Sequence, residues 1–141
     1  MDTDLIKIKF EPKSIINVDG GNVYHVFKSN GSKYNIGEVY FSSIENGFVK
    51  GWKMQTMMNS KFCVPQGNVQ FIFVSKDFKH TKTFCIGEDN YGLLSVPKNI
   101  WYCFKGISNT KSLILNLADR EHNSDYIKKI NLDEFPLKLK I

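Results

Sequence analysis

The feature that most constrains the fold is a succession of short segments, spread along the whole chain, in which apolar and polar residues alternate. Residues 6–10 and 23–27 show this pattern, which is typical of strands with one buried and one exposed face. Turn signals such as Asp19-Gly20-Gly21 and Asn46-Gly47 separate the segments. Further aromatic and β-branched segments predict strands over residues 38–44, 47–52, 69–74, 83–86, 92–96, 101–104 and 112–117.

Helix is expected to be scarce, because Ala118 is the only alanine in the chain. The best helix candidate is the short segment 124–130, with Asn123 or Ser124 as its N-cap. About nine or ten regularly spaced strands are typical of a sandwich or barrel. Since 141 residues suit one domain, the sequence predicts a single all-β domain over residues 1–141 with a short C-terminal helix.

The charge of the chain is carried almost entirely by lysine. The 19 basic and 14 acidic residues give a net charge of +5, and Arg120 is the only arginine. Scattered lysines favour a solvated surface, or a positive cleft for a small phosphorylated ligand, over a nucleic-acid surface, where arginine is usual. A nucleic-acid-binding barrel is therefore the weaker hypothesis, and no nucleic-acid partner is expected.

Metal and nucleophile motifs are missing from the sequence. His25, His80 and His122 stand apart, without partners at ligand spacing, so no metal is expected. Cys63, Cys85 and Cys103 lie in apolar stretches without a CxxC pair and are expected to be reduced, buried thiols. With no apolar run long enough for a membrane helix and no signal-peptide pattern, we expect a cytoplasmic protein without a membrane partner.

Several short motifs follow one another in a distinctive order between residues 36 and 136. They are GEVYF (37–41), GFVKGW (47–52), VPQGNV (64–69), NYGLLSVP (90–97), WYCF (101–104) and LILNLAD (113–119). In this order and spacing the chain resembles the dTDP-4-dehydrorhamnose 3,5-epimerase family, whose members are metal-independent cupins that act on nucleotide sugars. The resemblance implies a cupin-type jelly-roll barrel of antiparallel strands, a nucleoside-diphosphate sugar as ligand, and no cofactor.

The resemblance also implies roles for two lysines of one strand. In the family, an Arg-Gly-Leu-His run carries the arginine that contacts the pyrophosphate and the histidine that removes the proton next to the sugar ketone. The run falls on Lys50-Gly51-Trp52-Lys53 here. Lys50 is thus expected to contact the diphosphate as a point charge, and Lys53 stands at the position of the base.

Other family positions are substituted as well. A second histidine position falls on Tyr102, and the position of the tyrosine acid falls near Arg120. The lysine that steadies the developing enolate falls on Ser60 or Lys61. The resemblance therefore implies a nucleotide-sugar site with altered acid–base groups.

The residues themselves leave alternatives open at these positions. Lys53 acts as a base only if burial or a neighbouring cation lowers its pKa from about 10.4 toward neutrality; otherwise it is an exposed amine. On a strand, Lys53 shares a face with Gln55. If that face is the lumen, Trp52 and Met54 pack outward, into a dimer contact for example, and in the opposite register they fill the core.

Two further polar residues are candidates for the site, and of these Asn116 is expected to face the lumen. Tyr102 is a proton donor to the sugar or a hydrogen-bonded core residue. Asn116 lies between two leucines, where a buried amide needs a partner from protein, water or ligand. Residues 119–121 form a simple turn or a lip of the pocket. The candidate residues are Lys53 and Tyr102 for catalysis and Lys50, Gln55, Lys61, Asn116 and Arg120 for substrate binding.

The predicted function is that of a nucleotide-sugar epimerase or isomerase of surface-polysaccharide biosynthesis, acting on a 4-keto sugar nucleotide by proton abstraction next to the ketone. Two alternatives stay open. One is a cupin that binds a sugar nucleotide or a partner enzyme without turnover. The other is a 3,4-ketoisomerase-type enzyme, because residues 125–135 resemble the C-terminal segment of that branch, although Lys53-Met54-Gln55 replaces its paired histidines.

The resemblance further implies a homodimer. In such cupins a side of the barrel pairs with a second copy, often with an exchanged N-terminal strand. We therefore expect residues 1–35 in the dimer contact, with residues 4–10 as the exchanged strand.

Overall fold

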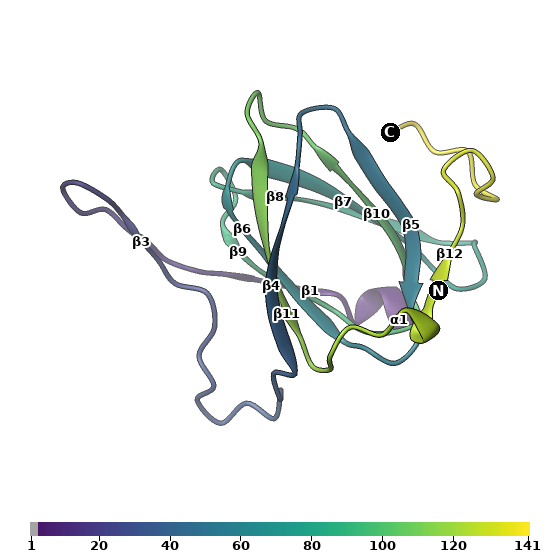
Figure 1. Ribbon diagram of the computed structural model, residues 1–141, viewed down its shortest axis with the longest axis horizontal. Helices are drawn as coiled ribbons and strands as arrows, with labels where there is room; N and C mark the ends of the chain where they lie inside the picture. Colours follow the sequence, from purple (N-terminus) through teal and green to yellow (C-terminus); the bar gives the residue numbers. More distant parts are fainter. Residues whose placement is uncertain (1–2) are drawn as a thin grey trace.

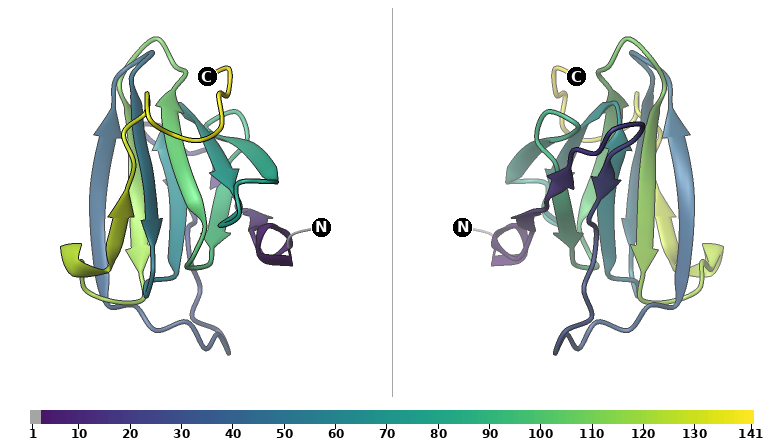
Figure 2. Two further views of the ribbon diagram at one scale, coloured as in Figure 1. Left: turned by 90° about the vertical axis from the view of Figure 1, so that its right-hand side faces the viewer. Right: turned by 90° about the vertical axis from the view of Figure 1, so that its left-hand side faces the viewer.

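The alternating segments form two five-stranded antiparallel sheets that face each other in the computed structural model, which describes residues 3–141 (Figures 1 and 2). One sheet has the order β1 (Lys9–Pro12), β9 (Gly92–Val96), β6 (Ser60–Gln66), β11 (Ser112–Ala118) and β4 (Glu38–Ile44). The other has the order β12 (Ile127–Lys129), β5 (Val49–Gln55), β10 (Trp101–Gly106), β7 (Asn68–Val74) and β8 (Thr81–Gly87).

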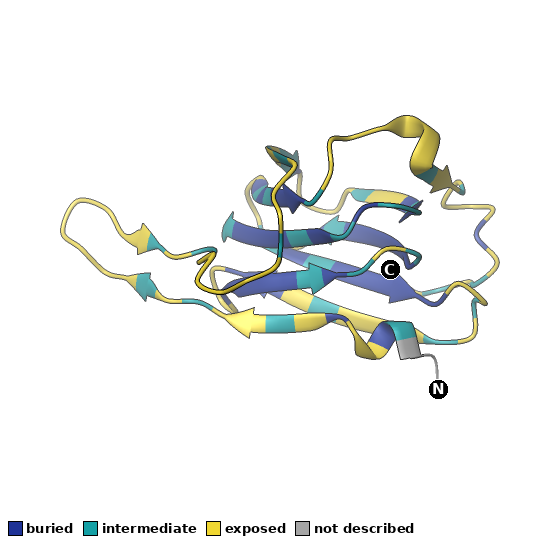
Figure 3. Ribbon diagram, turned by 90° about the horizontal axis from the view of Figure 1, so that it is seen from below, coloured by how far each residue is buried: buried dark blue, intermediate teal, exposed yellow. Residues whose placement is uncertain are grey.

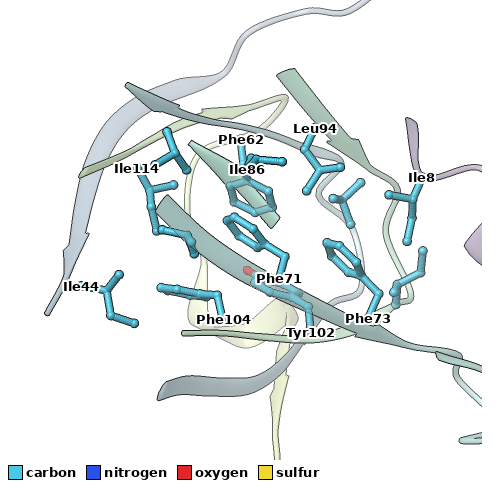
Figure 4. Packing of buried hydrophobic residues seen from close by; sticks show 14 of the residues in the cluster. Ile8, Ile44, Phe62, Phe71, Phe73, Ile86, Leu94, Tyr102, Phe104 and Ile114 are labelled. Atoms are coloured by element: carbon cyan, nitrogen blue, oxygen red, sulfur yellow. The ribbon is translucent and has the colours of Figure 1, made fainter. Parts of the chain in front are cut away.

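An aromatic core fills the space between the two sheets (Figure 4). Because side chains alternate along a strand, Tyr102 and Phe104 of β10 point inward together. They meet Phe71 of the neighbouring β7 and Phe62 of the opposite sheet, with ring centroids 5.2 Å apart for Phe62 and Phe71. The alternation of β10 predicts that Tyr102 and Phe104 share one face, and the structure shows that this face points inward.

A second apolar cluster lies on the outer face of the sheet that contains β5. Trp52 and Met54 point outward there, and the C-terminal segment that follows β12 covers them. Phe135 of that segment stacks on Trp52, with ring centroids 3.9 Å apart. The side chains of Trp52 and Met54 therefore point away from the lumen, whereas Lys53 points into it. The C-terminal segment of the same chain covers Trp52 and Met54.

The N-terminal part includes a hairpin that extends away from the sheets (Figures 1 and 3). After the short helix α1 (Thr3–Ile6), strands β2 (Ile15–Ile16) and β3 (Val23–Tyr24) pair with each other and with neither large sheet. Apolar residues of this hairpin, among them Val18 and Val23, are about half exposed, at 50% and 48%.

The structure corrects four details of the sequence prediction. The strand expected over 6–10 runs over Lys9–Pro12 and follows a helical turn. The strand β6 was not predicted, because Pro65 and the run of buried residues from Phe62 to Val64 break the alternation. Cys85 is exposed, since it lies on the outer side of the edge strand β8, whereas Cys63 and Cys103 are buried as expected.

The fourth correction concerns residues 124–130, where a helix was expected. Only Ser124–Tyr126 form a 3-10 turn, capped by the Asn123 side chain, and residues 127–129 form β12. Pairing with β5 outweighs the local helical tendency, because Trp52 and Ile130 exchange two backbone hydrogen bonds of 3.1 Å. No helix in the described chain is both long and apolar enough to cross a membrane.

Candidate functional site

A cavity of about 360 Å³ opens between the sheets beside the aromatic core. Its apolar wall consists of Phe62, Phe71, Phe104 and Ile114. Strands β4, β5, β10, β11 and β12 supply polar side chains around this wall. These side chains are Tyr40, Ser42, Lys50, Lys53, Tyr102, Asn116 and Lys129, and Asn131 follows β12.

Three lysines line this cavity. Lys50 and Lys53 come from β5, and Lys129 comes from β12 directly opposite Lys53 in the strand register. The Lys50 Nζ donates a hydrogen bond of 2.7 Å to the Ser43 carbonyl oxygen. Within residues 3–141, no carboxylate or histidine lines the cavity and no ion pair involves these three lysines. The site is therefore cationic, and its own side chains do not neutralise it.

The surroundings of Lys53 disfavour the charged form of its amine. Burial is the main cause that lowers its pKa, and the positive charges of Lys129 and Lys50 lower the pKa further. The Lys53 Nζ lies 5.7 Å from the centroid of the Tyr102 ring. Burial and a neighbouring cation are the two features that lower the pKa of a lysine enough for it to act as a base, and Lys53 has both.

The Tyr102 hydroxyl is held in its protonated form. Burial raises its pKa most, the charge of Tyr40 raises it further, and a hydrogen bond with the Gln55 side chain opposes them. Tyr102 is 5% exposed and Gln55 6% exposed. Gln55 does not line the cavity but holds the hydroxyl of Tyr102, so it positions that group.

Asn116 faces the cavity from β11, next to Ile114. Its Nδ2 donates to the Tyr40 carbonyl oxygen at 3.3 Å and to the Ser42 Oγ at 3.2 Å. The amide is thus satisfied by protein atoms and fixed at the cavity wall.

Two predicted binding residues lie away from this cavity. Lys61 is on the outer face of β6, where its Nζ donates to the Ser95 Oγ at 2.7 Å and lies 4.6 Å from the Tyr34 ring centroid. It lines a separate hollow of about 220 Å³. Arg120 is exposed in the turn after β11, where both carboxylate oxygens of Asp119 accept hydrogen bonds from Asn59. The structure thus brings together Lys50, Lys53, Tyr102 and Asn116, with Gln55 behind them.

Sequence reasoning missed Lys129, Tyr40 and Ser42. Tyr40 and Ser42 follow from the alternation of β4, whose inner face they share with Ile44. Lys129 could not be found in this way, because its place depends on β12 pairing with a strand about 75 residues earlier. No group of three or more His, Cys, Asp or Glu side chains that could hold a metal occurs among residues 3–141.

Comparison with known proteins assigns the chain to a family. The family model described as "FdtA: WxcM-like, C-terminal" matches residues 3–138. The chain belongs to this FdtA family. The chain is also similar to the probable low-salt glycan biosynthesis epimerase Agl13 of Haloferax volcanii, with 29% identity over 110 residues, which cover 72% of this chain and 70% of that protein.

Solved structures share the cupin-type fold of this chain. A dTDP sugar isomerase from Desulfovibrio desulfuricans G20 is similar with a TM-score of 0.86 and 26% identity, covering 94% of this chain and 90% of that one. A dTDP-6-deoxy-D-glucose-3,5-epimerase of Legionella pneumophila, solved with dTDP-4-keto-L-rhamnose, has a TM-score of 0.76 at 15% identity, with coverage of 89% and 73%. The predicted resemblance to nucleotide-sugar epimerases and isomerases and the predicted all-β jelly-roll architecture are confirmed.

Proposed function

We propose that the cavity binds a nucleoside-diphosphate sugar and that the protein is an epimerase or isomerase of a 4-keto sugar nucleotide in surface-polysaccharide biosynthesis. The observation that carries the proposal is the set of three lysines around a cavity with an aromatic wall, which no carboxylate among residues 3–141 lines. A diphosphate supplies the missing negative charge, and a sugar ring fits against the apolar wall.

The size of the cavity suggests which part of such a ligand lies inside it and which part lies outside. At about 360 Å³, the cavity is near the lower end of the roughly 300–1,000 Å³ that small-molecule sites occupy. We therefore place the keto sugar inside and the nucleotide across the rim. Lys50, which is exposed, and Lys129 then serve as point charges for the diphosphate.

The two proposed reacting groups are Lys53 and Tyr102, and burial shifts the pKa of both, as it also does for Tyr40 of the same cavity. Lys53, whose amine loses its proton more easily than an ordinary lysine, promotes loss of the proton next to the ketone, most simply as a general base. Tyr102 remains protonated and donates to a sugar oxygen. This pairing of an amine and a phenol gives the site a base and an acid without histidine.

Epimerisation and 3,4-keto isomerisation share this first proton loss, and the D. desulfuricans structure is that of a dTDP sugar isomerase. Both reactions are therefore covered by the proposal. Binding without turnover is the remaining alternative, favoured by the hydrogen bond that already engages the Tyr102 hydroxyl.

The test is incubation with dTDP-4-keto-L-rhamnose in heavy water, followed by mass spectrometry and NMR of the recovered sugar. Deuterium at C3 or C5, lost in Lys53→Ala and kept in Lys111→Ala, is the expected result; Lys111 is an exposed lysine outside the cavity. Binding of dTDP by calorimetry with no deuterium uptake would establish binding without turnover. No binding of dTDP would overturn the proposal.

A further inference from the structure

Lys53 differs from the other lysines of the cavity in its freedom to react. The Lys50 Nζ is engaged by the Ser43 carbonyl, and Lys129 stands on the outermost strand of its sheet. Lys53 lies between them on β5, partly buried and without a carboxylate partner among the described residues. Burial and neighbouring cations are the two conditions that turn a lysine into a nucleophile toward carbonyl carbon.

A primary amine also offers chemistry that an imidazole lacks. Its nitrogen carries two replaceable hydrogens and can form a carbon–nitrogen double bond, whereas a histidine ring nitrogen cannot. A lysine at position 53 that faces a cavity for keto sugars therefore has a covalent route open to it.

We propose that Lys53 forms a Schiff base with the ketone of the bound sugar, an inference that rests on the keto-sugar function proposed above. The geometry that points to it is the position of Lys53 on the cavity wall, beside the Tyr102 ring and flanked by Lys50 and Lys129.

The step balances without a further reagent. The ammonium form of Lys53 gives up one proton to solvent, and the free amine attacks the carbonyl carbon to form a carbon–nitrogen bond. The carbonyl oxygen, protonated by that solvent proton and by one amine hydrogen, leaves as water, and an iminium cation remains. The net change is ammonium plus ketone to iminium plus water.

The iminium then acts as an electron sink for the carbon next to it. The proton on the carbon next to it leaves to solvent water, and the electrons of that carbon–hydrogen bond move into the enamine. Return of the proton on either face, followed by hydrolysis, releases the sugar and the free lysine. Tyr102 keeps its role as the hydrogen-bond donor to a sugar oxygen.

Reductive trapping tests this inference. The protein is incubated with dTDP-4-keto-L-rhamnose and sodium cyanoborohydride, which reduces iminium ions in preference to ketones, and the intact mass and peptide map are measured. We expect one adduct per chain on Lys53, suppressed by excess dTDP and absent with dTDP alone. Lys53→Arg should lose the adduct and still bind dTDP by calorimetry, whereas Lys111→Arg should keep it.

The outcomes separate this inference from the function on which it rests. Deuterium uptake into the sugar without an adduct on Lys53, or an adduct spread over surface lysines and indifferent to dTDP, would overturn the Schiff base and leave the epimerase or isomerase in place. Absence of both dTDP binding and deuterium uptake would overturn both. Because the peptide map is made on the wild-type chain, the result does not depend on how the variants fold.

Discussion

Lys53 shows how one side chain links stability to pH. Its folded-state pKa lies below that of an unfolded lysine, mainly because of burial. The unfolded chain therefore binds the proton more readily, and protonation opposes folding. This penalty is fully present below the folded-state pKa and disappears as the pH rises toward the ordinary value of 10.5.

Lys53→Met is accordingly expected to stabilise the protein at pH 7, because it removes a partly buried charge that lies near two like charges. The gain should shrink as the pH approaches 10.5, where the wild-type amine also becomes uncharged. Urea unfolding of both proteins at a series of pH values measures this difference. Lys111→Met serves as the control, and a gain that does not change with pH would contradict the linkage.

Tyr102→Phe tests whether the phenol takes part in the reaction. Removing the hydroxyl leaves the buried Gln55 amide short of a partner, which we expect to cost about 1–2 kcal/mol of stability. If Tyr102 also donates to the sugar, deuterium uptake should fall about a hundredfold with little change in the affinity for dTDP. Loss of stability with unchanged uptake would make it a core residue only.

The sequence predicts this site well where the strand alternation decides, and less well elsewhere. Lys53, Tyr102 and Asn116 reach the cavity because their neighbours Trp52, Cys103 and Leu117 are apolar and point the other way. Lys61 was expected in the site, but β6 turns it outward. The family resemblance alone could not show on which side of the sheet Lys61 lies, because residues 60–66 were not recognised as a strand.

At the scale of elements, the C-terminal segment has two structural roles. It forms part of the cavity wall, and it covers the outer face of the sheet that contains β5. β12 presents Lys129 to the cavity, and Phe135 packs on Trp52 and Trp101 on the other side of the same sheet. The helical propensity of residues 124–130 could not reveal this arrangement, because partners on β5 and β10 determine it. The predicted strands, by contrast, are found, several with shifted ends, since their pattern is local; the segment predicted over 6–10, for example, becomes Lys9–Pro12.

Phe135→Ala is expected to destabilise the protein by about 3–5 kcal/mol, because a fully buried ring is removed from a packed cluster. It should also weaken dTDP binding, because without the Phe135 ring β12 is held less firmly against β5, and Lys129 of β12 is then less well positioned. Chemical unfolding and calorimetry measure the two effects. Leu132→Ala, which removes a residue of the same segment that is 43% exposed, should change neither by much.

Lys129→Ala separates the charge of β12 from its packing. We expect about a tenfold loss of affinity for dTDP, as for loss of a charge-assisted hydrogen bond, with the stability unchanged or slightly increased. Titration calorimetry at low salt gives the affinity, and Lys128→Ala, on the same strand but not on the cavity wall, is the matched control. Equal effects of the two variants would indicate a general charge effect.

At the scale of the whole molecule, exposed apolar residues gather at the N-terminal hairpin and on β4. Ile16, Val18 and Val23 are 46–50% exposed, and Phe41 of β4 is 61% exposed. Such groups suit burial against another surface. The homodimer with residues 1–35 in its contact therefore stays a prediction, with this hairpin as the part that reaches outward (Figure 3).

Light scattering after size exclusion tests the homodimer, for which we expect about twice the chain mass of 16.2 kDa. The double variant Val18→Asp and Val23→Asp should shift the protein toward the monomer without loss of fold, since both side chains are about half exposed. A wild-type monomer at high concentration would refute the prediction.

The three lysines of the cavity, to which the part of the chain that the structure describes adds no lining carboxylate, have a consequence for handling the protein. Three like charges around one cavity repel one another when nothing lies between them, so any multivalent anion that enters raises the thermal midpoint by mass action. Phosphate or sulfate in a buffer would therefore protect the protein against heat. It would also lower the apparent affinity of a nucleotide, because both compete for the same cavity.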